Sequence, residues 1–203
     1  MTQTPVLSAE LESAPEVVRK AAKFLREGKL VAFPTETVYG LGVSMDHPDA
    51  VERLYRVKGR PKEKELTLAI AGFSDLKKYG VILEPAAETF AKRFWPGPLT
   101  LLLKNRGGET IGVRMPGHPV ARAILSEAGV AVGLPSANPS GKTPPRSAEE
   151  VLTYFDGVID LIVDGGKTAL GISSTVVDLT GPAWKIVREG VITTEEIRRA
   201  WPG

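Results

Sequence analysis

The sequence contains no cysteine among its 203 residues, and this absence removes several kinds of chemistry at once. Disulfides, thiolate zinc sites and cysteine nucleophiles are excluded, and the composition fits a reducing compartment. No stretch approaches the ~18 consecutive apolar residues of a membrane-spanning helix, and the first residues lack the basic and apolar regions of a signal peptide. We therefore expect a soluble, cytoplasmic protein that makes no contact with a membrane.

The chain also lacks a strong excess of either charge. It has 26 basic and 24 acidic residues, a formal net charge of +2, so no overall field indicates nucleic-acid binding. Basic residues do gather between Arg53 and Lys64. Such a cluster is typical of a solvated helix end, where cations complement the helix dipole, and equally of an anion-binding site.

Familiar catalytic signatures are missing as well. His47 and His118 are the only histidines, and each precedes a proline at a predicted helix start, where a capping or turn role is commoner than metal ligation. There is neither a His-x-x-x-His zinc pair nor a Gly-x-Ser-x-Gly nucleophile elbow. No protein-bound metal is expected. The sequence favours catalysis by positioning of substrates and neutralisation of charge.

Apolar residues at helical and strand spacings alternate along the chain, which predicts an α/β fold with a twisted, mixed sheet. No shift in composition marks an internal boundary, so we expect one domain. Capping boxes predict helix starts at Ser13, Ser147 and Thr193. Further helices are predicted from residues 46, 84 and 119, and strands over 30–33, 66–71, 99–103, 110–115, 130–134, 160–163, 173–179 and 184–187.

The most informative segment is 33–42, Phe-Pro-Thr-Glu-Thr-Val-Tyr-Gly-Leu-Gly, which follows a short apolar run. Pro34 cannot continue a central strand, so the polar residues after it are predicted to lie in a loop that extends through Gly40 and Gly42. Loops at strand ends often carry ligand chemistry. We interpret this segment as a binding loop.

Three later segments place polar residues after predicted strands. Residues 133–145 contain Gly-Lys-Thr, as a phosphate-binding P-loop does, but Ser136 replaces its first glycine and Pro144 opposes the helix that must follow. Residues 164–175 form a glycine-rich loop that can bring backbone N–H groups close to an anion. Arg188 ends a strand, where its guanidinium suits a phosphate or carboxylate, or a surface ion pair.

Six motifs occur in a fixed order along the chain. They are Pro-Thr-Glu-Thr-Val-Tyr-Gly-Leu-Gly (34–42), Lys-Gly-Arg-Pro (58–61), Trp-Pro-Gly-Pro-Leu-Thr (95–100), Val-Arg-Met-Pro (113–116), Ser-Ala-Asn-Pro-Ser-Gly (136–141) and Ser-Ser-Thr-Val-Val-Asp (173–178). Together they closely resemble the motifs of the YrdC-like threonylcarbamoyl-AMP synthases. The resemblance covers about residues 14–190, and it leads us to expect an N-terminal extension (1–13) and a YrdC-like domain (14–203) of the short, single-domain form.

The resemblance implies a single domain whose twisted sheet and flanking helices surround a concave basic cavity. It implies that L-threonine, bicarbonate and ATP, with Mg²⁺, give L-threonylcarbamoyl-adenylate and pyrophosphate, a nucleotidyltransferase reaction. The product would feed a threonylcarbamoyl transferase complex that modifies the adenosine beside the anticodon of tRNAs, so a contact with tRNA is also conceivable.

The resemblance also assigns roles to residues of this chain. A catalytic role falls to Lys58 and Arg60, which would face the nucleotide phosphates, and we expect Lys58 to be an exposed cation. A segment such as residues 62–65 is expected to close over the labile carbamate. By the same resemblance, L-threonine is bound by Thr35, Arg114 and Ser174, and ATP by Lys58, Arg60, Ser136, Asn138 and Arg188.

Two alternatives remain open at this point. One is an RNA-binding or translation-associated paralogue of the same fold without synthase activity, although few aromatic residues accompany the basic cluster. The other is a carbamoyl-transfer domain like those embedded in hydrogenase maturation factors. The chain also departs from the family pattern, because residues 66–70 lack a histidine that longer members have, and residues 143–146 lack the usual serine-proline-threonine ending.

Overall fold

The chain alternates helices and strands as predicted, and the strands pair into one ten-stranded sheet. A computed structural model describes residues 3–9 and 14–202. Parallel and antiparallel pairs occur together, which confirms the predicted mixed α/β sheet with flanking helices. The strand order is β1-β8-β2-β3-β7-β4-β6-β5-β9-β10.

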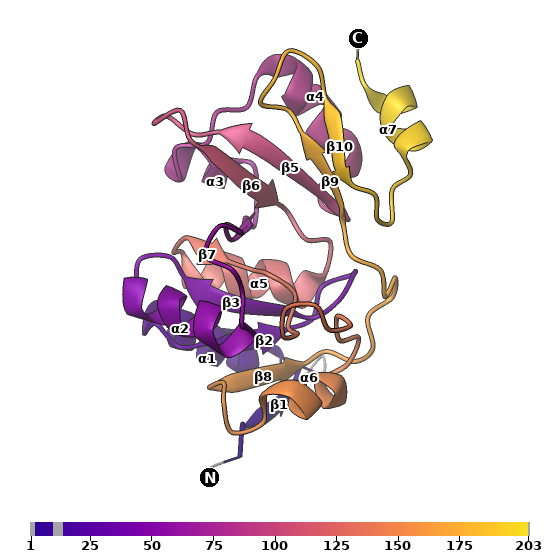
Figure 1. Ribbon diagram of the computed structural model, residues 1–203. Helices are drawn as coiled ribbons and strands as arrows, with labels where there is room; N and C mark the ends of the chain where they lie inside the picture. Colours follow the sequence, from indigo (N-terminus) through magenta and orange to yellow (C-terminus); the bar gives the residue numbers. More distant parts are fainter. Residues whose placement is uncertain (1–2, 10–13, 203) are drawn as a thin grey trace.

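The half of the molecule that holds the N-terminus consists of three layers (Figure 1). Successive side chains of a strand point to opposite faces, so each central strand serves two cores. In β2, Val31 and Phe33 pack with helices α1 and α5, whereas Ala32 packs on the other side with α2 and α6. The elements of this half are β1 (Val6–Ser8), α1 (Ala14–Arg26), β2 (Val31–Phe33), β3 (Gly40–Ser44), α2 (Pro48–Lys58), α5 (Pro119–Ala128), β7 (Val132–Gly133), α6 (Ala148–Phe155) and β8 (Leu161–Asp164).

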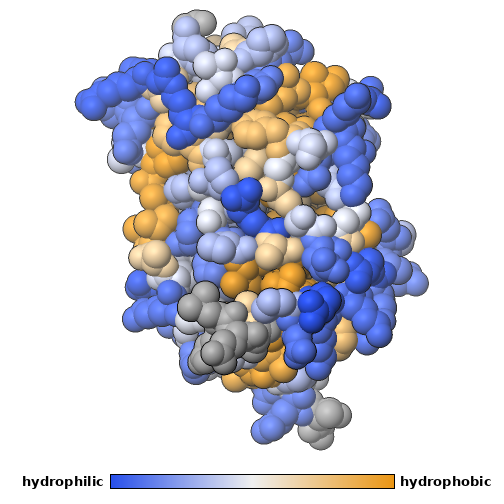
Figure 2. All heavy atoms as spheres, turned by 180° about the vertical axis from the view of Figure 1, so that it is seen from behind, coloured by the Kyte–Doolittle hydropathy of each residue, from blue (hydrophilic) through white to orange (hydrophobic). Residues whose placement is uncertain are grey.

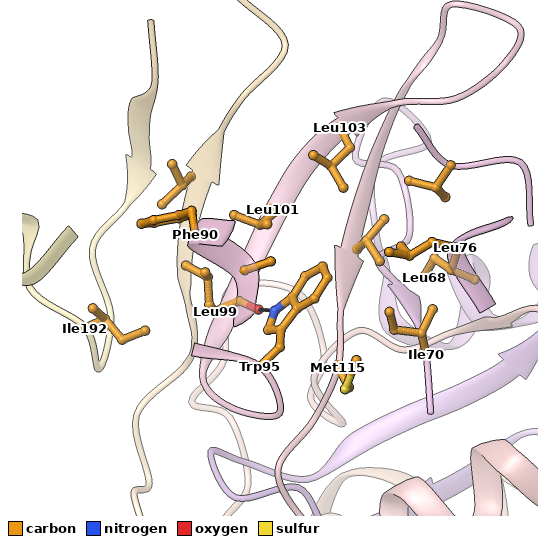
Figure 3. Packing of buried hydrophobic residues seen from close by; sticks show 14 of the residues in the cluster. Leu68, Ile70, Leu76, Phe90, Trp95, Leu99, Leu101, Leu103, Met115 and Ile192 are labelled. Carbon is orange, nitrogen blue, oxygen red and sulfur yellow. Dashed lines mark hydrogen bonds between the residues drawn. The ribbon is translucent and has the colours of Figure 1, made fainter. Parts of the chain in front are cut away.

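The other half carries the C-terminus, and helices cover one face of its strands (Figure 1). Its core contains Phe90, which forms edge-to-face ring contacts with Phe94 and Trp201, each with ring centroids 5.2 Å apart. Trp95 lies in the same core and donates an indole hydrogen bond of 2.8 Å to the Leu99 carbonyl (Figure 3). The elements are β4 (Leu68–Ala69), α3 (Ser74–Lys78), α4 (Pro85–Phe94), β5 (Leu99–Lys104), β6 (Thr110–Arg114), β9 (Thr175–Asp178), β10 (Lys185–Arg188) and α7 (Thr194–Ala200).

The predicted helix ends are largely confirmed. Thr193 and Glu196 form the full reciprocal capping box at α7. Ser147 caps α6 by accepting the Glu150 N–H, but the Glu150 carboxylate accepts the Arg146 N–H instead of completing a box. His118 caps α5 with its ring nitrogen, while the His47 side chain caps nothing and contacts the Arg26 carbonyl. The predicted cap at Ser13 lies outside the described residues.

Three elements were not predicted: β1, β3 and α3. The prediction that Gly40 and Gly42 lie in a loop is wrong, because both belong to β3, which pairs with β2. A side chain at Gly42 would approach the Phe33 ring to 2.7 Å, and one at Gly40 would approach Leu134 to 2.6 Å. These glycines therefore permit close packing within a buried strand. The strands predicted over 66–71 and 130–134 shorten to two residues each.

On the face seen in Figure 2, hydrophilic side chains predominate and apolar side chains show between them in separate patches. Scattered apolar side chains of this kind are normal on a folded domain. Within the described part of the chain, no helix has the length and apolar character needed to cross a membrane.

The core of the C-terminal half should depend strongly on Leu101, which is fully buried in β5. We expect Leu101→Ala to lower the free energy of unfolding by about 2–5 kcal/mol, because the shortened side chain leaves a cavity. Urea unfolding followed by circular dichroism would measure the change. Val187→Ala, at a site that is 58% exposed, serves as the control and should change stability by no more than about 0.5 kcal/mol. Equal effects of the two substitutions would contradict the assignment of Leu101 to the core.

Candidate active site

A cavity of about 240 Å³ is lined by residues from both halves of the molecule. The N-terminal half contributes Val38 from the loop after β2, Arg60 from the end of α2, and the segment after β7. The C-terminal half contributes strands β5, β6, β9 and β10. The lining consists of Val38, Arg60, Thr67, Thr100, Leu102, Arg114, Leu134, Pro135, Ser136, Ser173, Ser174, Val176 and Arg188.

The pleat of the strands builds one wall of this cavity. In β5, Leu99 and Leu101 point into the core, so Thr100 and Leu102 must point to the opposite face, where they line the cavity. In β9, Val177 is in the core while Val176 faces the cavity. The face of these strands that the helices leave uncovered is therefore the wall of the site.

Arg188 reaches the cavity because β10 is irregular at that point. The register between β10 and β9 shifts between Ile186 and Arg188, a bulge of the kind that re-aims side chains beside functional sites. The Arg188 guanidinium donates to the Ser174 carbonyl, at 2.8 Å from Nη2, and Nη2 also lies 3.3 Å from the Ser174 hydroxyl. Gly190 packs against the same backbone, because a side chain there would come within 2.2 Å of the Ser173 carbonyl oxygen.

Arg114 extends from the end of β6 and is held by several partners. Its Nη2 donates to a Glu36 carboxylate oxygen and to the Thr37 hydroxyl, both at 2.7 Å, and its Nε lies 3.4 Å from the Gly97 carbonyl oxygen. The Glu36 and Arg114 side chains are only 16% and 13% exposed. Such a pair is a well-ordered internal feature rather than a surface ion pair.

Thr35 ends a chain of hydroxyl hydrogen bonds that starts at Arg114. The Thr37 hydroxyl lies 2.8 Å from the Thr35 hydroxyl, which donates to the Val38 carbonyl at 2.6 Å. Since each hydroxyl has one proton, Thr37 must donate to Thr35 in this arrangement. Thr35 lines a small pocket of about 30 Å³ that shares Arg114 with the main cavity. A pocket of this size can hold about one water molecule or methyl group.

Arg60 lines the cavity and also holds the segment that follows it. Its guanidinium donates to the carbonyls of Lys64 and Glu65 at 2.9 and 2.8 Å. The Tyr55 hydroxyl donates to the Lys64 carbonyl as well. The segment 62–65, expected to close over the site, is thus tied to a residue that a ligand would contact.

The expectation that Lys58 is exposed is wrong. Lys58 is only 3% exposed, and its ammonium donates to the carbonyl of Ser136 at 2.5 Å and to that of Asn138. The Lys58 carbonyl in turn accepts the Ser140 N–H. A lysine can be buried in this way because the backbone carbonyls compensate part of its lost hydration. Lys58 therefore braces the 136–140 segment and does not line the cavity.

The remaining predicted residues fall into two groups. Ser136 and Ser174 line the main cavity, and the Ser174 hydroxyl lies 2.8 Å from that of Thr100. Asn138 is buried and donates to the carbonyls of Pro139 and Lys142, so its amide group supports its own loop. The structure thus gathers Arg60, Arg114, Ser136, Ser174 and Arg188 around one cavity, with Thr35 beside it and Lys58 and Asn138 behind.

Sequence reasoning missed Glu36, Thr67 and Thr100. The two threonines sit between core leucines, in Leu66-Thr67-Leu68 and Leu99-Thr100-Leu101, so strand alternation could have identified them. No pattern in the neighbouring sequence indicates the role of Glu36, because its partners Arg114 and Gly117 are about 80 residues away in the sequence.

The cavity carries positive charge. Partial burial lowers the pKa of the Arg188 guanidinium, and the nearby charges of Arg114 and Arg60 lower it further. Among the residues that the structure describes, Glu36 pairs with Arg114, whereas no carboxylate forms an ion pair with Arg60 or Arg188. Hydroxyl groups and two uncompensated guanidiniums are suited to an anionic ligand.

The chain belongs to the Sua5/YciO/YrdC family. The model of this family, which is described as telomere recombination, matches residues 23–190. This match covers the elements that build the cavity, from the loop after β2 to β10.

Relatives of known name and structure are closely similar. The threonylcarbamoyl-AMP synthase of Pyrococcus abyssi is 45% identical over 90% of this chain and 56% of that protein. That of Bacillus subtilis is 43% identical over 93% of this chain and 57% of that protein. The crystal structure of P. abyssi Sua5 complexed with L-threonine matches 97% of this chain and 60% of that chain, with 43% identity and a TM-score of 0.89. The chain therefore spans a little over half the length of these curated relatives.

Lys58 should make the stability of the protein depend on pH. Burial, followed by the charge of Arg60, lowers the pKa of Lys58 to about 7 from an ordinary value of 10.5. Between these values the unfolded chain binds more protons at this position than the folded chain, so the free energy of unfolding rises with pH. We expect the stability of the wild type relative to Lys58→Met to increase between about pH 7 and about pH 9 in urea unfolding.

Lys62→Met provides the control, because Lys62 forms an exposed ion pair with Glu52. Its stability relative to the wild type should be nearly independent of pH over the same interval. A wild-type advantage over Lys58→Met that stays constant or falls with rising pH would refute the burial effect.

Proposed function

We propose that the chain is an L-threonylcarbamoyladenylate synthase, a nucleotidyltransferase that forms threonylcarbamoyl-AMP and pyrophosphate from L-threonine, bicarbonate and ATP. Relatives at 43–45% identity carry the name threonylcarbamoyl-AMP synthase, and the similar Sua5 structure is a complex with L-threonine. The single observation that carries the proposal is the convergence of Arg60, Arg114 and Arg188, from distant parts of the sequence, on one hydroxyl-lined cavity.

The phosphates of ATP would bind at Arg60 and Arg188, which both line the cavity. ATP brings several negative charges, and these two guanidiniums can balance them because neither is paired with a carboxylate of the described residues. Ser136 adds a hydroxyl on the same lining. Lys58 and Asn138 would act on the nucleotide by fixing the 136–142 segment, since the Asn138 amide and two of the three Lys58 ammonium hydrogens already donate there.

L-threonine would bind beside Arg114. An arginine suits a carboxylate because its planar group offers donors in a fixed geometry. Thr35 lines the small pocket that shares Arg114 with the main cavity, and Ser174 lines the main cavity, where it accepts from Arg188. Residues 66–70, around β4, contain no histidine, and Thr67 supplies the cavity-facing polar group there instead.

The chemistry requires a dry, ordered site rather than a protein nucleophile. The threonine nitrogen combines with bicarbonate to give a carbamate and water, and a carbamate oxygen then attacks the α-phosphorus as pyrophosphate leaves. Holding both reactants in one cavity supplies proximity, and the two free arginines stabilise charge on the departing pyrophosphate. The 62–65 segment, tied to Arg60, would limit access of water.

Magnesium would enter with ATP. The part of the chain that the structure describes has no group of three or more acidic or histidine side chains placed to hold a metal ion. The cavity offers hydroxyls and guanidiniums, so these residues fit a Mg²⁺ ion whose ligands are nucleotide phosphates and water. Bound there, Mg²⁺ would neutralise phosphate charge. The released adenylate would pass to a threonylcarbamoyl transferase complex that acts on tRNA.

The test is pyrophosphate release from ATP by the purified protein in the presence of Mg²⁺. We expect release only when L-threonine and bicarbonate are both present, with threonylcarbamoyl-AMP detected by mass spectrometry. No release under these conditions, together with tight and salt-sensitive binding of RNA, would overturn the proposal in favour of an RNA-binding paralogue.

Arg188→Gln should weaken the use of ATP more than that of threonine. Loss of one hydrogen bond to a charged group costs about 1.5–3 kcal/mol, which corresponds to a fall in kcat/KM for ATP of roughly 10- to 150-fold. Steady-state kinetics with each substrate varied in turn would measure it. Lys185→Gln removes an exposed cation from the same strand and should leave both constants unchanged. An equal loss for ATP and threonine would contradict the placement of Arg188 at the phosphates.

A further inference from the structure

Glu36 is an acidic residue that pairs with Arg114, one of the predicted substrate-binding arginines, and no role has been assigned to it. It lies in the loop between β2 and β3, with its carboxylate 2.7 Å from Arg114 Nη2. Its second oxygen accepts the Gly117 N–H at 2.8 Å. The carboxylate thus bridges the end of β6 and the segment that leads to α5.

Glu36 is held in place from several directions. The Leu170 N–H donates to its backbone carbonyl, and its carboxyl group packs against Gly117, where an added side chain would come within 3.4 Å of it. The Glu36 charge also reaches the half-buried His118, where it partly offsets the lowering of the His118 pKa by burial. A carboxylate fixed in this way cannot simply swing aside when a ligand enters the cavity.

The consequence for Arg114 is a restricted set of free donors. Both hydrogens of Nη2 are used by Glu36 and Thr37, and Nε faces the Gly97 carbonyl. Among the described residues, Nη1 has no partner, so Arg114 offers two N–H groups from one nitrogen to a ligand. Its charge, moreover, is already balanced by Glu36.

This pairing gives the arginines of the cavity different electrostatic character. Arg60 and Arg188 carry unbalanced positive charge, whereas the Arg114–Glu36 pair is close to neutral. A phosphate dianion brings only negative charge and would be repelled by the Glu36 carboxylate at short range. A zwitterionic amino acid brings a carboxylate for Nη1 and an ammonium group, with no net charge to oppose.

We infer that Glu36 is a specificity-determining residue, whose fixed carboxylate reserves the Arg114 guanidinium for an amino-acid zwitterion and excludes phosphate from it. The assignment of the amino acid as substrate rests on the proposed function. The exclusion of phosphate rests only on the geometry of Glu36 and Arg114. Together they explain how one basic cavity can bind a triphosphate and an amino acid in one fixed arrangement, each at its own arginines.

Two substitutions separate the charge of Glu36 from its geometry. Glu36→Gln keeps the size and a hydrogen-bond acceptor but removes the charge, whereas Glu36→Asp keeps the charge and shortens the reach. Glu88→Gln, which removes a carboxylate from an exposed pair on α4, is the matched control. Each variant is first compared with the wild type by circular dichroism and thermal unfolding.

The measurement is calorimetric titration with L-threonine at increasing inorganic phosphate and constant ionic strength. In the wild type and Glu88→Gln, phosphate should leave the threonine Kd unchanged. In Glu36→Gln, phosphate should compete and raise the apparent threonine Kd by roughly tenfold, because Arg114 becomes an uncompensated cation. Glu36→Asp should bind threonine more weakly and remain insensitive to phosphate. A structural role alone would make both variants weak and neither sensitive to phosphate, which would overturn the inference.

A direct titration with phosphate tests the inference even if threonine does not bind. Glu36→Gln should gain a phosphate site at Arg114, in addition to any phosphate bound by Arg60 and Arg188 in the wild type, and Glu36→Gln/Arg114→Gln should lose it again. Absence of the gained site refutes the role of Glu36. By contrast, failure of the wild type to bind threonine or release pyrophosphate, with the gained site present, refutes the proposed function alone.

Discussion

The alternation of side chains along each strand is the constraint on which the rest of this structure depends. In β5, Leu99, Leu101 and Leu103 pack in a hydrophobic core. The residues between them, Thr100 and Leu102, therefore point to the opposite face and form the wall of the cavity. The same division places Arg114 next to core Val113. A shift of one residue in any of these strands would exchange core and site, so fold stability and site geometry are specified together.

The site concentrates cations that repel one another, and the fold offsets this repulsion in different ways. Arg114 is neutralised by a carboxylate, and Lys58 is surrounded by backbone carbonyls. Among the described residues, Arg60 donates to backbone carbonyls and Arg188 to the Ser174 carbonyl and hydroxyl, so both keep their net charge. Uncompensated charge therefore remains on the two arginines at which phosphate is proposed to bind. A ligand with several negative charges would relieve a repulsion that the empty site already contains.

Much of the fold could be predicted from sequence because its signals are local. The box at Thr193, the helix from Pro119 to Ala128 and the hairpin of β5 and β6 each depend on neighbouring residues. Strand β3 was missed because its glycines, read as turn residues, serve tight packing against residues distant in sequence. The candidate site was recovered largely through family motifs. The burial of Lys58 and the pairing of Glu36 with Arg114 could not be predicted, since both depend on partners about 80 residues away in the sequence.

Arg188 occupies an unusual position for a residue proposed to contact a nucleotide. It ends β10, the last strand of the sheet, which pairs only with β9 and is interrupted there by a bulge. Outer strands separate from a sheet at lower free energy than central ones. Partial detachment of β10 would withdraw one of the two unbalanced cations while Arg114, on a central strand, kept its place. Affinity for phosphate and affinity for the amino acid can thus be lost independently, long before the protein itself unfolds.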